Sequence, residues 1–363
     1  MKRTVVLCGP SLDSVSGVAT HLMQLFESTL ARQYTLVQFQ VGSEGRSERA
    51  IAKIARLFTS PLHLFALILR ARPDIIHLNS SLEPKAYWRD LAYLLVAKVM
   101  GCKVVYQVHG GSLPDVFLGT NRFAQSFLRW SLNLPDVVVL LAEVELDAYR
   151  KFNAGKRLAV IPNAIALSEY QTAYPKNFEA LPIQLGSIGR LADDKGVMET
   201  ILALAILRES GANWFKLRIA GSGPYESTLR KAVEEHDMGA VVQFVGPIFG
   251  KEKMDFWREI KIFVFPTFHR EGLPYTILES IASGTPLITT RVGGIPDVVA
   301  DGVHGLLLDS HEPQTIADAI RTIALDTERL QKMSEAAIER AQENYSVQRL
   351  SNQFHLLYRE LLS

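Results

Sequence analysis

Short runs of β-branched residues alternate with longer amphipathic segments along this chain, and the alternation occurs twice. Runs that are apolar throughout are typical of strands buried on both faces of a parallel sheet. Because helical patterns lie between most runs, the rhythm predicts parallel sheets covered by helices. The predicted strands are Thr4–Cys8, Thr35–Val41, Ile75–Leu78, Lys103–Val108, Val137–Leu141 and Leu158–Ile161, then Gln184–Ile188, Lys216–Ala220, Val241–Val245, Ile262–Phe265, Pro286–Thr290 and Gly305–Leu308.

A polar stretch, Ser168–Leu181, separates the two sets of strands. The 363 residues, of which 48% are hydrophobic, are enough for two domains with a core each. We expect an α/β chain with two doubly wound, Rossmann-like domains, over 1–168 and 169–344, that face one another across a cleft. The tail is helical in pattern, and its last helix, 345–363, is expected to pack back onto the first domain.

Charge, cysteine content and segment length exclude several classes of protein. With 39 Lys+Arg and 38 Asp+Glu, the chain lacks the basic balance of a nucleic-acid-binding protein, so no nucleic-acid partner is expected. Cys8 and Cys102 form no disulfide framework or metal motif, which predicts a reducing, cytoplasmic location. The apolar stretches Leu57–Leu69 and Leu91–Met100 are shorter than the roughly 20 residues of a spanning helix, so no transmembrane segment is expected.

Basic residues gather in the first half of the chain, where 12 basic and 5 acidic residues occur between 46 and 129. The segment Ala50–Arg72 mixes four of these cations with Leu, Ile and Phe. Such a segment is typical of an amphipathic helix on an anionic membrane surface, here the inner face of the plasma membrane. An ordinary helix that covers a sheet is the alternative that the pattern leaves open.

The loop that follows the strand Ile262–Phe265 carries the richest chemistry. Pro274 suits the first position of a helix, whose free N–H groups would favour an anion such as phosphate. Glu271 lies just before this helix and Glu279 about two turns into it. Carboxylates beside a bound anion favour the hydroxyls of a sugar or ribose as donors. In the alternative, Glu271 caps the helix and Glu279 is solvated.

Two further loops follow strands of the second set. Arg190 and Lys195 lie five residues apart at another helix start, where two cations call for a compensating anion such as a diphosphate. Pairing of both cations with Asp193 and Asp194 is the alternative. The turn at Gly221 would let a nucleotide approach the backbone, although the G-x-G-x-x-G fingerprint of dinucleotide-binding proteins is absent.

In the first half of the chain, two post-strand loops are candidates for the site. Gly17 lies in a polar loop after the opening strand, and His109 ends the strand Lys103–Val108 beside Gly110 and Gly111. A histidine at this end of a strand can reach into a cleft. A hydrogen-bonded structural histidine is the alternative.

Taken together, these loops resemble the retaining family-4 glycosyltransferases of GT-B architecture, over essentially the whole chain. The most specific match is a glutamate, seven residues and a second glutamate, from Glu271 to Glu279, with the downstream segments Ser280–Pro286 and Gly293–Val299. Two positions depart from the family pattern. Ser16-Gly17 stands where many members have two glycines, and Asp297 stands where Glu is common.

The resemblance implies a role for each candidate residue. Arg190 and Lys195 would bind the donor diphosphate, Glu271 the hydroxyls of the transferred sugar, and Glu279 the nucleotide ribose. His109 would lie beside the reacting carbon. The other implied donor-binding residues are Gly17, Gly221, Gly272, Leu273 and Pro274.

The function implied by the resemblance is that of a metal-independent, retaining hexosyltransferase. It would move a sugar from a UDP- or GDP-sugar to a glycan or lipid-linked saccharide, in the synthesis of cell-surface polysaccharide or glycoconjugate. The nucleotide sugar is a co-substrate, and no cofactor or metal is expected. The alternatives are a GT-B-fold nucleotide-sugar epimerase, a phosphorylase and a non-catalytic nucleotide-sugar-binding protein.

Overall fold

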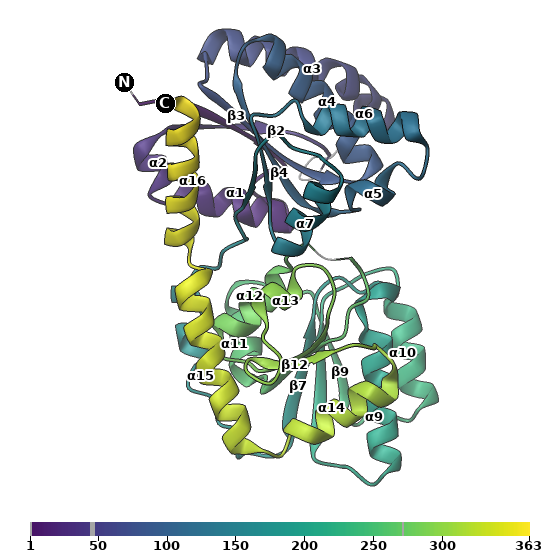
Figure 1. Cartoon of the computed structure of the whole chain (residues 1–363). Coiled ribbons are helices and arrows are strands. Elements are labelled where there is room, and N and C mark those ends of the chain that lie inside the picture. The colour runs from purple at the N-terminus through teal and green to yellow at the C-terminus, as the bar shows by residue number, and fades with distance from the viewer. Residues whose placement is uncertain (1, 44–47, 271) are drawn as a thin grey trace. The chain divides into compact units, whose positions relative to one another are not determined.

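Two units, each built on a six-stranded parallel sheet with helices on both faces, make up the chain (Figure 1). A computed structural model describes residues 2–43, 48–270 and 272–363. The first unit comprises Met1–Ala164, Arg270–Leu273 and Val347–Ser363, and the second comprises Ile165–His269 and Pro274–Ser346. The prediction of two doubly wound α/β sheets is confirmed.

The first sheet has the strand order β2-β1-β3-β4-β5-β6. Every predicted strand of this set is present, but β3 and β4 continue beyond their predicted ends and so include polar residues at their carboxyl ends. The strands are β1 (Thr4–Gly9), β2 (Thr35–Gln40), β3 (Ile75–Leu82), β4 (Lys103–Gly111), β5 (Val137–Leu140) and β6 (Leu158–Val160).

Alternate residues of these strands build two separate apolar layers. Val5 and Leu7 of β1 pack with α1 and α16, whereas Val6 and Cys8 pack with α3 and α4. The Tyr358 hydroxyl of α16 lies 2.6 Å from Nδ1 of His77 on β3, which ties the last helix to this sheet. The helices are α1 (Gly17–Glu27), α2 (Leu30–Gln33), α3 (Ala50–Ala71), α4 (Pro84–Val99), α5 (Pro114–Phe117), α6 (Arg122–Leu132), α7 (Glu143–Lys151) and α16 (Val347–Leu362).

The second sheet has the order β12-β11-β10-β7-β8-β9 and is also parallel throughout. The predicted strands are again all present. The strands are β7 (Ile183–Ile188), β8 (Phe215–Ala220), β9 (Val242–Gly246), β10 (Ile262–Phe265), β11 (Leu287–Thr290) and β12 (Gly305–Leu308). The helical segments are α8 (Leu167–Tyr170), η1 (Gln171–Ala173), η2 (Asp193–Lys195), α9 (Val197–Glu209), α10 (Glu226–Glu235), α11 (Gly250–Glu259), α12 (Tyr275–Ala282), α13 (Ile295–Val298), α14 (Pro313–Ile323) and α15 (Thr327–Asn344).

Helix α3 corrects one expectation about apolar segments. The sequence predicts no stretch long enough to cross a membrane, yet 51–71 form one continuous helical segment of sufficient length and apolarity. Only 17% of its most apolar window is buried in the protein. The predicted stretch Leu57–Leu69 is too short because the helix begins at Ala50 and includes Ile51 and Ile54, which precede that stretch.

Candidate functional site

The second sheet reverses its strand order between β7 and β10. From β7 the chain continues to β8 on one side, and from β10 it continues to β11 on the other. In open parallel sheets, ligands bind beyond the carboxyl ends of the strands at such a reversal. The loop after β7 carries Arg190 and Lys195, and the loop after β10 leads to Pro274. The topology therefore brings these three candidate residues to one edge of the sheet.

These two loops are joined through Asp194. Its backbone carbonyl accepts hydrogen bonds from the N–H groups of Phe268, at 3.1 Å, and His269, at 3.0 Å. Its carboxylate lies 2.5 Å from Nδ1 of His269. Arg190 is exposed and has no ion-pair partner among the described residues. The alternative in which Asp194 pairs with Arg190 is thus wrong. The Arg190 guanidinium extends from a loop that the contacts of Asp194 with Phe268 and His269 attach to the loop after β10.

Gly221 is required by contact between neighbouring loops. A Cβ at this position would lie 1.9 Å from the carbonyl oxygen of Gly189, and the φ of +127° is one that L residues rarely adopt. Its N–H donates to the carbonyl of Gly246 at 2.7 Å. Close packing of the loops after β7 and β8 therefore explains this glycine without any ligand, a reason that the sequence pattern did not indicate.

Helix α12 begins at Tyr275, one residue later than predicted. Pro274 has extended backbone angles and serves as the residue before the helix rather than as its first residue. The first-turn N–H groups of any helix lack acceptors within the helix, and they carry the positive end of its dipole. The start of α12 therefore adds a second source of positive charge to the edge that carries Arg190.

Glu279 is held by side chains of α11. Lys253 Nζ lies 2.5 Å from one carboxylate oxygen, and Trp257 Nε1 donates to the other at 3.2 Å. The side chain is buried, so the alternative in which Glu279 is solvated is wrong. Burial, and secondarily the charge of Glu279, raises the pKa of Tyr170. A carboxylate accepts up to about four hydrogen bonds, which leaves capacity for hydroxyl donors.

Lys253 and Trp257 were missed by the sequence analysis. They lie 26 and 22 residues before Glu279, on a different helix. No motif or helical spacing links positions on separate elements, so the sequence carried no signal for this contact.

The first sheet reverses its order between β1 and β3, and a cavity of about 390 Å³ lies at the same edge. Gly17 is the first residue of α1, whose N-cap Ser16 accepts a hydrogen bond from the Ala19 N–H. Ser16, Asn79 and His109 all line the cavity. The structure thus brings the loop of Gly17 and the strand end of His109 together at one point of this unit.

Asn79 determines which nitrogen of His109 carries the proton. The Asn79 Nδ2 group donates to the carbonyl of Cys8 at 3.1 Å, so its Oδ1 is the atom 2.8 Å from His109 Nε2. Because Oδ1 only accepts, Nε2 is the donor, and Nδ1 of a neutral ring is left as an acceptor. Sequence reasoning missed Asn79, although a polar residue at the carboxyl end of an apolar strand was an available signal.

Three neighbouring histidines are held neutral in this unit. The rings of His21 and His109 meet edge to face, with centroids 4.9 Å apart. Burial lowers the pKa of His21 to about 4 and that of His77 to about 3, and it lowers the pKa of His109 well below its usual range. His109 is therefore an uncharged, hydrogen-bonded histidine that also lines a cavity. It has features of both sequence-based alternatives, the structural histidine and the histidine that faces a binding site.

Gly272 and Leu273, which lie between the two glutamates of the signature, belong to the first unit and contact other residues of it. A Cβ on Gly272 would lie 3.2 Å from Cα of Gly110, and the Leu273 carbonyl accepts a hydrogen bond from Asn163 Nδ2 at 2.9 Å. Gly272 therefore lies next to Gly110, the residue that follows His109, while Leu273 is held by Asn163. Glu271 lies outside the described residues.

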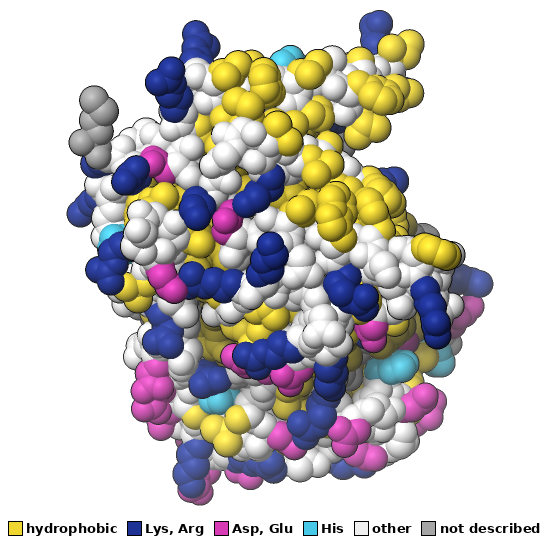
Figure 2. Space-filling view, turned by 45° about the horizontal axis from the view of Figure 1, so that its top comes forward, with side chains coloured by type: hydrophobic (Ala, Val, Ile, Leu, Met, Phe, Trp, Pro, Cys, Tyr) yellow, Lys and Arg dark blue, Asp and Glu magenta, His cyan; other side chains and the backbone are white. Residues whose placement is uncertain are grey.

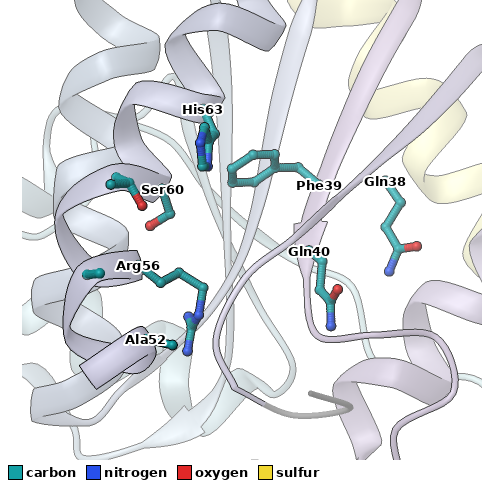
Figure 3. Close-up of a pocket in the computed structure, with 9 residues that line it drawn as sticks. Gln38, Phe39, Gln40, Ala52, Arg56, Ser60 and His63 are labelled. Carbon is teal, nitrogen blue, oxygen red and sulfur yellow. The ribbon is translucent and has the colours of Figure 1, made fainter. Parts of the chain in front are cut away.

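A second cavity of about 440 Å³ separates β2 from α3. Figure 3 shows Phe39 and Gln40 on the strand opposite Arg56, Ser60 and His63 on the helix. Arg56 also lines the 390 Å³ cavity, so the two cavities adjoin. Its guanidinium forms an ion pair with Glu48 at 3.0 Å. Within 2–43, 48–270 and 272–363, we find no cluster of three or more His, Cys, Asp or Glu side chains suited to a metal ion.

Family profiles match both halves of the chain. The profile described as "Glycosyl transferases group 1" matches residues 175–340, and that described as "Glycosyltransferase Family 4" matches residues 15–169. The first covers every described candidate residue of the second unit, and the second covers Gly17 and His109.

Two curated relatives show the range of similarity. The amylovoran biosynthesis glycosyltransferase AmsK of Erwinia amylovora is 30% identical over 138 residues, which are 37% of this chain and 34% of AmsK. A D-inositol 3-phosphate glycosyltransferase of Corynebacterium aurimucosum is 27% identical over 88% of this chain and 79% of its own. The chain spans about a third to a half of the length of several curated relatives that it matches.

Solved structures share the fold over the full length. A sucrose-phosphate synthase from Thermosynechococcus elongatus has a TM-score of 0.78 at 19% identity, with 99% of each chain covered. Anabaena Alr3699/HepE in complex with UDP and glucose has a TM-score of 0.74 at 14% identity, and the alignment covers 98% of this chain and 99% of that one. At such identities the likeness supports the architecture alone.

Proposed function

Because this chain belongs to the glycosyl transferases group 1, with a family 4 first half and a GT-B fold, we propose that it is a retaining hexosyltransferase. It takes a sugar from a UDP- or GDP-sugar and transfers it to a glycan or lipid-linked saccharide. The product belongs to a cell-surface polysaccharide or glycoconjugate. The reaction takes place in the cytoplasm, which suits the two free, buried cysteines Cys8 and Cys102.

The observation that carries this proposal is the arrangement at the reversal point of the second sheet. Arg190 and Lys195 on one loop and the start of α12 after the neighbouring strand supply positive charge there. Glu279, held by Lys253, supplies hydrogen-bond acceptors on the same helix. A diphosphate joined to a ribose needs this combination of donors, cations and acceptors.

The proposed chemistry is mainly electrostatic. When the bond between the sugar and the diphosphate breaks, negative charge grows on the diphosphate. Arg190, Lys195 and the helix start stabilise this charge because they are already oriented toward it. The acceptor hydroxyl attacks from the face that the diphosphate leaves, its proton passes to the departing phosphate oxygen, and the anomeric configuration is retained. Neutral His109 offers Nδ1 as an acceptor to a sugar hydroxyl.

Relatives support the substrate classes to different degrees. The name of AmsK refers to the synthesis of a polysaccharide, and the Anabaena structure was solved with UDP and glucose. The Corynebacterium relative acts, by its name, on D-inositol 3-phosphate, a small phosphorylated acceptor. We propose a saccharide acceptor and treat a small polyol phosphate as an outcome that the assay must distinguish.

The first experiment measures nucleotide binding by calorimetry with UDP, GDP, ADP and dTDP, in buffer that contains EDTA. Binding of UDP or GDP is expected, together with weaker binding by Arg190→Ala and Glu279→Ala. Arg321→Ala is the matched control, because this exposed arginine lies on α14 and pairs with Asp318. The matching nucleotide sugar is then supplied with acceptors, and NMR reads the anomeric configuration of the product.

Four results would contradict the proposal. Binding of none of the four nucleotides would remove the donor site, and binding without transfer or hydrolysis would indicate a non-catalytic protein. A product of inverted configuration would contradict retention. Loss of activity in EDTA that Mg²⁺ restores would contradict metal independence.

A further inference from the structure

Helix α3 presents apolar side chains to solvent along its whole length. Residues that recur every three or four positions lie on one side of an α-helix. On the opposite side, Leu64 and Ile68 are buried in the core of the first unit. A helix at the surface of a soluble protein ordinarily has a polar outer side, but α3 is apolar on both. The outer stripe consists of Ile51, Ile54, Phe58, Leu62, Phe65 and Leu69, each between 41% and 82% exposed.

Two neighbouring helices on the same face of the sheet continue this surface. Trp88 of α4 stacks on Phe127 of α6 with ring centroids 5.7 Å apart, and Phe127 lies 5.4 Å from Trp130. Figure 2 shows apolar side chains gathered in the upper part of the view, with Lys and Arg side chains at the margins. We call the outer stripe of α3 together with Trp88, Leu95, Val99, Phe123, Phe127 and Trp130 the apolar face.

Cations surround the apolar face, and α3 itself contains no Asp or Glu. Lys53 and Arg70 are exposed near the two ends of α3, and Lys85 and Arg122 are exposed at the starts of α4 and α6. Two nearby acids form ion pairs with arginines, Glu48 with Arg56 at 3.0 Å and Asp90 with Arg89 at 2.6 Å. Glu83 and Asp115 are exposed nearby. The excess of exposed positive charge around an apolar centre is complementary to an anionic lipid surface.

We propose that the apolar face lies on an anionic bilayer, with α3 parallel to the membrane plane. Although α3 is long enough to cross a bilayer, its inner side is part of the core of the first unit, and insertion across the membrane would remove Leu64 and Ile68 from that core. When α3 lies parallel to the membrane plane, the core of the first unit covers its inner side and the bilayer covers its outer stripe. Trp88 of α4 and Trp130 of α6 are of the residue type that concentrates at the level of the lipid headgroups.

A second copy of the chain is a less suitable occupant. In a symmetric pair of α3 helices, each contact is repeated by the same residues of both chains. Contact between two apolar faces would bring the cation-rich margins of both copies together, with the exposed Lys85 and Arg122 of each chain near those of the other. Because α3 has no acidic residue, nothing on the helix would compensate this repulsion.

Binding of the apolar face to a bilayer also indicates which class of acceptor the protein uses. This inference rests on the proposed function. The cavity between β2 and α3 adjoins the one that His109 lines, and Arg56 belongs to both. The saccharide of an acceptor whose lipid remains in the bilayer can therefore pass through the cavity between β2 and α3 to the cavity that His109 lines. We infer that the acceptor is a lipid-linked saccharide rather than a free one.

The test is flotation of the full chain with two kinds of vesicle, phosphatidylcholine alone and phosphatidylcholine mixed with phosphatidylglycerol. Binding to the mixed vesicles is expected, and it should weaken as salt increases. The variant Ile54→Ser/Phe58→Ser/Leu62→Ser should bind roughly tenfold more weakly. The matched control is Leu181→Ser/Phe249→Ser/Leu325→Ser, which removes three similarly exposed apolar side chains from the second unit and should bind like the wild type.

Circular dichroism and nucleotide binding show whether each variant is folded. A second variant, Lys53→Glu/Arg70→Glu, should lose binding to the mixed vesicles while all apolar residues remain. Equal flotation of all variants, or no flotation of the wild type, would overturn the proposal. A wild-type dimer that dissociates in the serine variant of α3 would assign the apolar face to a second copy instead.

These outcomes remain separable from the proposed function. Flotation without any nucleotide binding would retain the membrane surface and reject the transferase. Nucleotide binding and transfer to a free saccharide, without flotation, would retain the transferase and reject the membrane surface. Faster transfer to a lipid-linked than to a free saccharide, lost in the serine variant of α3, is the result expected if both proposals hold.

Discussion

The two units share a parallel six-stranded architecture but differ in where they expose apolar and charged groups. Of the 24 large apolar side chains that are exposed among the described residues, 18 belong to the first unit and six to the second. The sheet edges differ as well. At the strand reversal of the first unit, neutral His109 lines a cavity together with Arg56 and Arg89, each of which forms an ion pair. The second unit instead has the exposed Arg190, which has no ion-pair partner among the described residues. One fold class thus supports an apolar surface beside a site with paired arginines and a polar surface beside a site with an unpaired arginine.

This difference teaches that sheet topology determines where a site forms but not its chemistry. Both reversals bring loops together at the carboxyl ends of strands, as the fold requires. Side chains on those loops then decide whether the edge attracts a diphosphate or accommodates a neutral group. The following variants test this division between the units.

The largest effect is expected at the charged edge of the second unit. Arg190→Ala and Lys195→Ala should each reduce kcat for transfer roughly 100-fold, because each removes a cation that stabilises charge on the leaving diphosphate. Steady-state kinetics with the donor identified by calorimetry provide the measurement. Both variants should float with vesicles like the wild type. A fall in flotation, or unchanged kcat, would contradict the division between the units.

Gly221→Ala tests the loop packing that supports this edge. The new Cβ would overlap the Gly189 carbonyl at 1.9 Å, and we expect a loss of about 3 kcal/mol in the free energy of unfolding. Urea titration measures this change. Gly239→Ala is the control, since no atom lies within 4 Å of a Cβ there. Equal stability of the two variants would show that the loops rearrange without cost.

Acid should destabilise the first unit through its buried histidines. The pKa of His21 is about 4 in the folded protein against an ordinary 6.5, so the unfolded chain gains a proton that the folded chain does not. Stability is therefore lost as pH falls from 6.5 toward 4, by roughly 1 kcal/mol per pH unit for such a histidine. Urea titrations across this range should give a smaller pH dependence for His21→Leu. The control His236→Leu, at an exposed position, should show the same pH dependence of stability as the wild type. If His21→Leu also kept the wild-type pH dependence, the loss of stability in acid would not come from His21.

The stability of the second unit should depend on pH in a different, alkaline range. Burial lowers the pKa of Lys176 to about 7 from an ordinary 10.5, so this residue adds stability as pH rises from 7 toward 10.5. The difference in unfolding free energy between wild type and Lys176→Met should change by roughly 1 kcal/mol per pH unit in this window. Urea titrations at several pH values measure it, with the exposed Lys231→Met as control. A constant difference would contradict the prediction.

The smallest effect is expected at the strand reversal of the first unit. Asn79→Ala removes the acceptor that holds the Nε2 proton of His109, and kcat should fall roughly tenfold because the ring no longer has one preferred tautomer. Imidazole ¹⁵N shifts report the tautomer without substrate, and His109→Gln identifies the signal. An unchanged tautomer in Asn79→Ala would show that another group holds the proton.

Most of the fold could be predicted because strand runs and helical periodicity are local properties of the chain. All twelve predicted strands are present, while β3 and β4 were predicted to end too early. The candidate residues on loops were found because parallel strands direct their carboxyl ends to one edge. The partners of those residues, Lys253 for Glu279 and Asn79 for His109, were not found, because they lie on other elements.

The sequence by itself determined the two parallel sheets, the family and the loops at which polar chemistry gathers. Each of these is encoded in short-range spacing or in a contiguous motif such as Glu271 to Glu279. Only the tertiary structure decided that Asp194 contacts His269 rather than Arg190, why Gly221 is a glycine, and which side of α3 faces outward. Periodicity shows which residues share one side of a helix, but α3 is apolar on both sides. The packing of Leu64 and Ile68 against the sheet is what leaves the stripe from Ile51 to Leu69 exposed.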